Sequence, residues 1–367
     1  MDSSMNEYES RKCWCGVHAY RLIIIGALCF LLSGLVAGTN AATIGIGYGT
    51  SGDNLPPTEQ VVQFLKTLNV TKVKIYNTDA NVIRAFANSG MDLSITVPNG
   101  DIIHMATDMT FTQNWVIYNL QPFVPATTIT TIAVGNEILT SDTADTDNLV
   151  PAMVNLHSAL VTAGLGDIKV STPHAFSVLN VSFPPSASVF RPSFAASVMK
   201  PLLDFLNQTG SPFMVNIFPF FSYMFNYNTI NLDYALLNPN APPVNDPGNG
   251  KIYTNLWDAQ IDAIISAMAS LGHPSIPIVV TESGWPSVGD VTQVGPSVAN
   301  AQTYNNNLVK LVLADPPKGT PLRPGVATPT YIFSLFNENL KTGKITEKNW
   351  GLFHPDMSPV YTASLST

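Results

Sequence analysis

The chain has 367 residues, of which 46% are hydrophobic and only 11% are charged, and its formal net charge is -8. A mildly acidic chain is a poor partner for phosphate backbones, so nucleic-acid binding is excluded, while neutral polymers such as polysaccharides stay open. The length allows either two domains or one large barrel around a single core.

Residues 1–41 have the layout of a secretory signal segment. Basic residues at Arg11, Lys12 and Arg21 precede or begin an apolar run over 22–38, and small residues follow up to Ala42. This order predicts a signal peptide cleaved near residue 41 and a secreted protein. An uncleaved signal anchor, which would place the protein at the plasma membrane, is the alternative, because the run is at the short edge of a membrane span. All three cysteines lie in this leader, so we expect no disulfides in the mature chain.

Strand-like and helix-like segments alternate after the leader. Amphipathic helical patterns cover 57–68 and 253–271. Eight apolar runs are typical of strands that are buried on both faces. They cover 43–49, 72–77, 92–98, 129–138, 169–174, 213–219, 277–283 and 330–337.

This alternation predicts one (β/α)8 TIM barrel, a single domain over residues 42–363. An open doubly wound sheet is the alternative. Gly45, Gly47 and Gly49 follow each other near a strand end, but they lack the third spacing of a dinucleotide-binding loop and an acidic partner. A long segment rich in Asn, Pro and aromatic residues, about 220–252, is expected on the C-terminal face of the barrel.

Two glutamates stand at the ends of apolar strands. Glu137 ends the fourth predicted strand in Val-Gly-Asn-Glu, and Glu282 ends the seventh in Val-Val-Thr-Glu. Charged groups at these positions are costly unless they face the mouth of the barrel. With typical strand spacing and tilt, the two carboxyl groups should lie about 6 Å apart, which is nearer to a retaining than to an inverting glycosidase.

The two carboxyl groups are expected to have different catalytic roles. A retaining glycosidase needs one ionised nucleophile and one acid that still holds its proton near neutral pH. We predict that Glu282 is the nucleophile, that Glu137 is the general acid/base, and that Asn136 binds the 2-hydroxyl of the sugar. Structural ion pairs are the competing interpretation for both glutamates.

Several motifs resemble those of glycoside hydrolase family 17, the plant endo-1,3-β-glucanases. Thr-Glu-Ser-Gly-Trp-Pro-Ser over 281–287 is similar to the nucleophile motif of that family, and Val-Gly-Asn-Glu over 134–137 is similar to its acid motif. Further similarity runs through 215–221, 336–339 and 349–353. The resemblance implies a β-1,3-glucan hydrolase (a glucan endo-1,3-β-glucosidase) in the cell wall or extracellular space. In plants such enzymes act in defence, wall growth or callose turnover.

The same resemblance implies further site residues. Glu338, Lys341 and Glu347 are expected beside the catalytic pair, where a lysine would help Glu282 to remain ionised; an exposed ion-pair network is the alternative. Six aromatic residues are expected to line the substrate site and stack on glucose rings: Tyr48, Tyr76, Phe218, Phe220, Tyr223 and Trp285. The chain departs from the family pattern at Phe218 and Phe220, where tyrosines are expected, and at Asn77 and Gly47.

The remaining predictions concern modification and partners. Three Asn-x-Ser/Thr sequons, at Asn69, Asn180 and Asn207, predict N-glycosylation. No histidine spacing indicates a metal site, so neither metal nor organic cofactor is expected. The expected partner of this monomer is a β-glucan. A mixed-linkage β-1,3-1,4-glucan hydrolase, transglycosylation, and a glucan-binding wall protein with little catalysis are the alternative functions.

Overall fold

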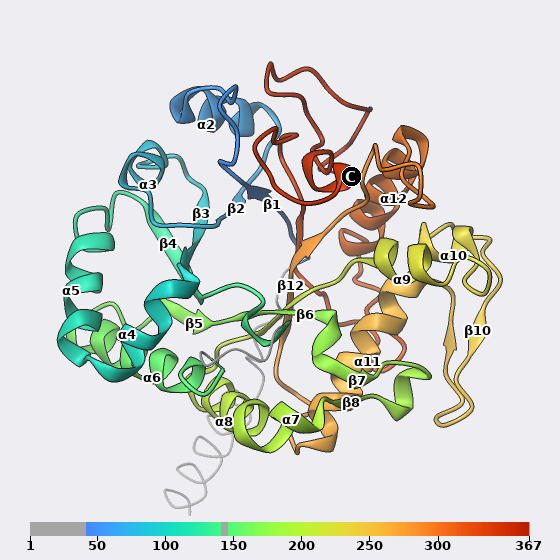
Figure 1. Cartoon of the computed structure of the whole chain (residues 1–367), viewed down its shortest axis with the longest axis horizontal. Helices are drawn as coiled ribbons and strands as arrows, with labels where there is room; N and C mark the ends of the chain where they lie inside the picture. The colour runs from blue at the N-terminus through green and yellow to red at the C-terminus, as the bar shows by residue number, and fades with distance from the viewer. Residues whose placement is uncertain (1–41, 141–145, 367) are drawn as a thin grey trace, which may run out of the picture. The chain divides into compact units, whose positions relative to one another are not determined.

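The computed structural model describes residues 42–140 and 146–366. The predicted signal segment, 1–41, lies outside the described residues. A single sheet of parallel strands forms the centre of the described part, and helices surround it (Figure 1). The order of the strands in this sheet is β5-β4-β3-β2-β1-β13-β12-β9-β6.

Each of the eight predicted strands is found, but some end earlier than expected: the fourth ends at Val134 and not at 138, and the eighth ends at Ile332 and not at 337. They are β1 (Ile44–Tyr48), β2 (Lys72–Ile75), β3 (Asp92–Val97), β4 (Thr128–Val134), β5 (Lys169–Ser171) continued by β6 (Pro173–Ala175), β9 (Phe213–Asn216), β12 (Ile278–Ser283) and β13 (Thr330–Ile332).

The two outer segments of the sheet, β5 and β6, are halves of one stretch of chain separated by Thr172. The first half pairs with β4 and the second half pairs with β9, so the ring of strands is nearly closed at this point. Pro173 begins the second half, and a proline has no backbone N–H to give to a ladder. The missing donor therefore coincides with the break between the two halves of this strand.

Helices cover the outside of the strand ring (Figure 1). Aspartate or asparagine side chains cap several of these helices, for example Asp79 at α3 and Asn255 at α11. The helices are α2 (Thr58–Thr67), α3 (Ala80–Ala85), α4 (Ile102–Thr107), α5 (Met109–Asn119), α6 (Leu149–Thr162), α7 (Pro192–Phe194), α8 (Lys200–Thr209), α9 (Pro219–Phe225), α10 (Leu232–Ala235), α11 (Leu256–Ser270) and α12 (Val298–Val312).

Two small hairpins lie outside the ring and were not expected from the sequence. One pairs β7 (Leu179–Val181) with β8 (Val189–Phe190), and the other pairs β10 (Val244–Asn245) with β11 (Ile252–Tyr253). Asp246 joins them, because its carboxylate accepts hydrogen bonds from the backbone N–H (2.7 Å) and the hydroxyl (2.6 Å) of Ser186. The segment expected as a long connection over 220–252 thus contains α10, β10 and most of α9.

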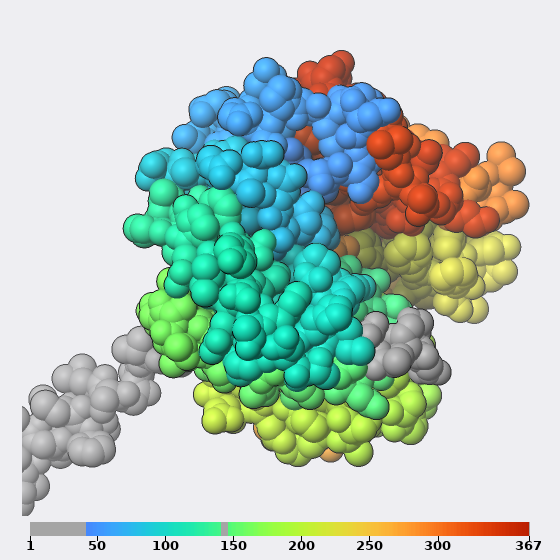
Figure 2. All heavy atoms as spheres, turned by 60° about the vertical axis from the view of Figure 1, so that its left-hand side comes forward, coloured from blue at the N-terminus to red at the C-terminus, as the bar shows by residue number. Residues whose placement is uncertain are grey.

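The first and last parts of the barrel pack against each other. β1 pairs with β13, and the ring of Phe64 on α2 lies 4.9 Å from that of Phe353 in the C-terminal segment. The blue β1–α2 region and the red C-terminal residues are neighbours in both views (Figures 1 and 2). This contact joins the two ends of the barrel sequence into one hydrophobic core.

Candidate active site

Glu137 and Glu282 both lie at the C-terminal ends of barrel strands. Glu282 is the fifth residue of β12 and is in register with Asn216, the last residue of β9. Glu137 follows β4 by three residues, and its backbone N–H donates to the carbonyl of Pro173 at 2.9 Å. Both glutamates therefore belong to the same rim of the barrel, where active sites of this fold are found.

A fully buried lysine contacts Glu282. The side chain of Lys74 on β2 has no exposed surface, and its Nζ lies 2.8 Å from Glu282 Oε1. The same Nζ donates to Asn136 Oδ1 at 3.3 Å and lies 4.6 Å from the centre of the Tyr76 ring. One ammonium thus joins β2, β12 and the end of β4, and it places a positive charge directly beside Glu282.

Glu137 is half-buried and has a different environment. Its Oε1 accepts a hydrogen bond from Asn216 Nδ2 at 2.8 Å, and Asn216 in turn accepts one from the Thr281 hydroxyl at 2.7 Å. Burial, together with the nearby charge of Glu282, raises the pKa of Glu137 above its ordinary value. Glu137, with its raised pKa, holds its proton to higher pH than an ordinary carboxyl group. Glu282, which is paired with an ammonium, lies close to it, so the rim offers both an acid and a base.

The three accessory residues implied by the resemblance lie in the last loop. Glu338 is buried, accepts a hydrogen bond from the Ser51 N–H at 2.7 Å, and lies 3.0 Å from the Lys341 ammonium. A Cβ at Gly49 would stand 2.4 Å from Glu338 Oε1, so only glycine leaves room for this carboxylate. Burial, and less strongly the charge of Glu282, raises the pKa of Glu347, while Lys341 opposes the rise.

The lysine paired with Glu282 is therefore Lys74, whereas Lys341 pairs with Glu338 and lies 4.1 Å over the Phe333 ring. Sequence reasoning missed Lys74 and Asn216, although Asn216 stands in a segment, 215–221, that resembles the family. A signal was present: Lys74 stands between Val73 and Ile75 in β2, and Asn216 ends the apolar run of β9. Polar residues at such positions are costly to bury without a partner.

The six aromatic residues expected to line the substrate site divide into two groups. Phe220 and Trp285 have no exposed surface, and their rings pack 5.2 Å apart. Tyr48 and Tyr223 are also buried, which leaves Tyr76 and Phe218 as the half-buried members. In this structure the rings of Phe220 and Trp285 are part of the core, and neither presents a face to solvent on which a sugar could stack.

All three sequon asparagines, Asn69, Asn180 and Asn207, are exposed. Asn69 follows α2, Asn180 is the central residue of β7, and Asn207 lies on α8. Each side chain is therefore accessible for modification.

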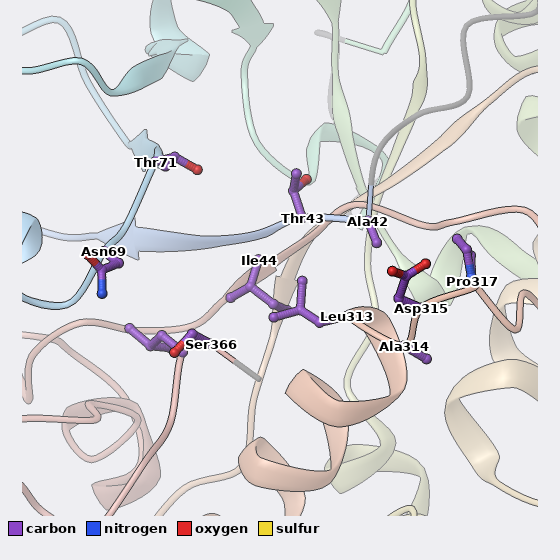
Figure 3. A pocket seen from close by; sticks show the side chains of 11 residues that line it. Ala42, Thr43, Ile44, Asn69, Thr71, Leu313, Ala314, Asp315, Pro317 and Ser366 are labelled. Carbon is purple, nitrogen blue, oxygen red and sulfur yellow. The ribbon is translucent and has the colours of Figure 1, made fainter.

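A pocket of about 460 Å³ lies at the opposite end of the strands (Figure 3). It is lined by Thr43 and Ile44 at the start of β1, by Thr71 just before β2, and by residues that follow α12. Asp315 is the only carboxylate in its lining, so this pocket offers no acid pair. Among residues 42–140 and 146–366, no group of three or more His, Cys, Asp or Glu side chains could hold a metal ion. No helix in that part of the chain is long and apolar enough to cross a membrane.

Comparison with known proteins agrees with this geometry. The model of the glycosyl hydrolases family 17 matches residues 44–365. A glucan endo-1,3-beta-glucosidase of Arabidopsis thaliana, number 11, is 43% identical over 340 residues, which cover 92% of this chain and 79% of that protein. The chain therefore belongs to glycosyl hydrolase family 17, and it is a glycoside hydrolase with a (β/α)8 barrel.

Two solved structures show the same fold. CJP38, a beta-1,3-glucanase and allergen of Cryptomeria japonica pollen, superposes with a TM-score of 0.83 at 48% identity and covers 88% of this chain and 99% of its own. A plant beta-glucan endohydrolase superposes with a TM-score of 0.79 at 38% identity and covers 87% and 99%.

Proposed function

We propose that this protein is a retaining endo-hydrolase of β-1,3-glucans, in which Glu282 is the nucleophile and Glu137 is the general acid/base. The observation that carries the proposal is the unequal environment of the two glutamates at one rim. Glu282 is paired with a buried ammonium at 2.8 Å, whereas burial and the charge of Glu282 raise the pKa of Glu137. The similarity to glucan endo-1,3-beta-glucosidases and to a beta-1,3-glucanase supports the substrate class.

The reaction proceeds in two displacements. In the first, Glu282 attacks the anomeric carbon, the glycosidic bond breaks, and Glu137 gives its proton to the leaving oxygen. In the second, Glu137 takes a proton from water, the water oxygen attacks the anomeric carbon, and Glu282 leaves as a carboxylate. Each step inverts the anomeric centre, so the product retains the β configuration. This chemistry uses only residues of the chain and water.

The other residues of the rim are assigned supporting roles. Asn136 is proposed to bind the 2-hydroxyl of the sugar, since its amide oxygen accepts from Lys74 and its amide nitrogen can therefore face a ligand. Tyr76 and Phe218 are proposed as sugar contacts because they are the half-buried aromatic residues of the predicted set. Three further residues are proposed to set the electrostatic environment of Glu137 and Glu282: Glu338, Lys341 and Glu347.

We further propose that the enzyme is a secreted, N-glycosylated monomer of the extracellular space or cell wall. The signal-like order of residues 1–41 and the exposure of the three sequon asparagines support this location.

Replacement of the nucleophile tests the assignment. We expect Glu282→Ala to lower laminarin hydrolysis by at least about 10³-fold, because no other group forms the covalent intermediate. Glu59→Ala, a change at an exposed position on α2, is the matched control and should keep full activity. Circular dichroism checks that both variants fold. Residual activity of Glu282→Ala near that of the control would remove Glu282 from the mechanism.

Linkage preference is tested separately. Purified laminarin and barley mixed-linkage glucan, compared at equal mass concentration, report the specificity through kcat/KM. The proposal expects laminarin to be the better substrate, and a preference for mixed-linkage glucan would reassign the substrate class without changing the proposed chemistry.

A further inference from the structure

Asn99 forms an unusual pair with the residue that precedes Glu137. Its Oδ1 accepts the backbone N–H of Asn136 at 2.9 Å, and its Nδ2 donates to the backbone carbonyl of Asn136 at 3.3 Å. One side-chain amide therefore satisfies both polar groups of a single residue in the main chain. Asn99 lies two residues after the end of β3, is exposed, and begins a short 3-10 helix, Asn99–Asp101.

The segment held by this amide has a strained backbone. Gly135 has a φ of +68° and Glu137 has a φ of +56°, so left-handed residues flank Asn136 on both sides. Residues with a Cβ rarely adopt this left-handed backbone conformation. Glu137 keeps its positive φ only because the surrounding contacts fix the backbone. Such residues concentrate at functional sites, where the geometry of one side chain matters more than local stability.

The contacts around this turn explain how it is fixed. The Gly135 N–H donates to the carbonyl of Val97 at 3.1 Å, which is the last contact of the β3–β4 ladder. Pro98 follows Val97 and has no N–H to continue that ladder. At Asn136 the Asn99 side chain supplies the hydrogen bond that a longer β3 would have made. At Glu137 the Pro173 carbonyl accepts the backbone N–H at 2.9 Å.

We propose that Asn99 is a positioning residue for proton transfer: its side-chain amide extends strand β3 and holds the left-handed turn that aims Glu137 at the leaving oxygen. This inference rests on the proposed role of Glu137 as the general acid/base. It does not require Asn99 to touch the substrate.

If Asn99 positions Glu137, the loss of activity in an Asn99 variant should depend on the leaving group of the substrate. A natural glucan needs a proton on its leaving oxygen, whereas a 2,4-dinitrophenolate leaves without one. We expect Asn99→Ala to lower kcat/KM for laminarin by about 10–100-fold and to leave kcat/KM for 2,4-dinitrophenyl β-laminaribioside within about 3-fold of wild type. A merely structural role would lower both values together.

Three further variants make the experiment decisive. Asn99→Asp keeps the acceptor for the Asn136 N–H and loses the donor, so it should recover part of the laminarin activity. Its added negative charge should move the basic limb of the laminarin pH profile upward, because a nearby anion raises the pKa of Glu137. Asn114→Ala, at an exposed position of α5, is the matched control and should leave kcat/KM unchanged for both substrates.

Glu137→Gln separates the two claims. If Glu137→Gln loses laminarin activity and keeps the activated substrate, Glu137 is the acid, and equal losses on both substrates in Asn99→Ala would then overturn only the role of Asn99. Full laminarin activity in Glu137→Gln would overturn the acid/base assignment and this inference with it. Thermal unfolding of every variant shows whether a loss of activity results from a smaller fraction of folded protein.

Discussion

Lys74 dominates the electrostatics of the site at the scale of single residues. An ammonium without exposed surface is costly to bury and persists only when a charged partner and further hydrogen bonds compensate it. Lys74 has both, because Glu282 lies 2.8 Å away and Asn136 lies 3.3 Å away. These contacts therefore hold the carboxylate of the proposed nucleophile in place beside a positive charge.

Replacing this ammonium by an apolar chain of similar length tests that role. We expect Lys74→Met to lower kcat for laminarin by at least about 100-fold, because Glu282 loses the ammonium that lies 2.8 Å from its carboxylate and is left buried without a charged partner. Lys72→Met is the matched control, since Lys72 lies on the same strand and pairs with Asp92 at a partly exposed site. Equal kcat values for the two variants would contradict the role of Lys74.

Prediction from the sequence was uneven at this scale. Glu137, Glu282 and Asn136 were predicted as site residues because each lies in a motif at the end of an apolar strand. Lys74 and Asn216 were passed over, because a strand pattern does not tell which neighbouring strand supplies a partner. Trp285 shows the opposite problem: it lies within the Glu282 motif, yet its ring packs against Phe220 in the core.

Among elements, the strands were predictable and the hairpins were not. Parallel strands buried on both faces leave continuous apolar runs, and all eight runs became strands or halves of one strand. The β7–β8 and β10–β11 hairpins are short and rich in polar residues and proline. Their stability depends on contacts such as that of Asp246 with Ser186, which no local pattern reveals.

Helix α11 carries a buried acidic pair that was not expected on an amphipathic helix. Asp258 and Asp262 lie one turn apart, and both are buried. Asp258 accepts a hydrogen bond from Asn255 at 2.7 Å, while its other oxygen has no hydrogen-bond partner within the described chain. Burial, strengthened by the charge of Asp262 and opposed by the Asn255 hydrogen bond and Lys318, raises the pKa of Asp258 from 3.8 to about 7.

This pair makes the stability of the fold depend on pH. A carboxyl group with a raised pKa holds a proton in the folded state that the unfolded chain releases, so its contribution is complete below pH 3.8 and is lost as the pH rises through 7. We expect Asp258 to account for a decrease of up to about 4 kcal/mol in the free energy of unfolding over that window.

Urea unfolding at pH 4.5 and pH 7.5 measures this decrease. Asp258→Asn cannot ionise and should show a smaller difference between the two pH values than the wild type. Asp167→Asn, at an exposed position, should behave like the wild type. An unchanged pH difference in Asp258→Asn would show that Asp258 is not the responsible group.

At the scale of the whole molecule, the barrel gathers residues that are far apart in the chain. Lys74, Glu137, Asn216 and Glu282 come from four different strands or strand ends, and hydrogen bonds connect them as two pairs. The rule that function gathers at the C-terminal strand ends predicted which rim holds the glutamates. The individual contacts could not be predicted, because they depend on the stagger of neighbouring strands, including the register shift between Val280 and Glu282.

The central claim is that this arrangement makes Glu282 the group that bonds to the sugar. A laminari-oligosaccharide with fluorine at carbon 2 and a good leaving group slows the second displacement and traps the intermediate. Digestion and mass spectrometry then locate the label. The account predicts one sugar on the peptide that contains Glu282, and a label on Glu137, on Glu338 or on no residue would contradict it.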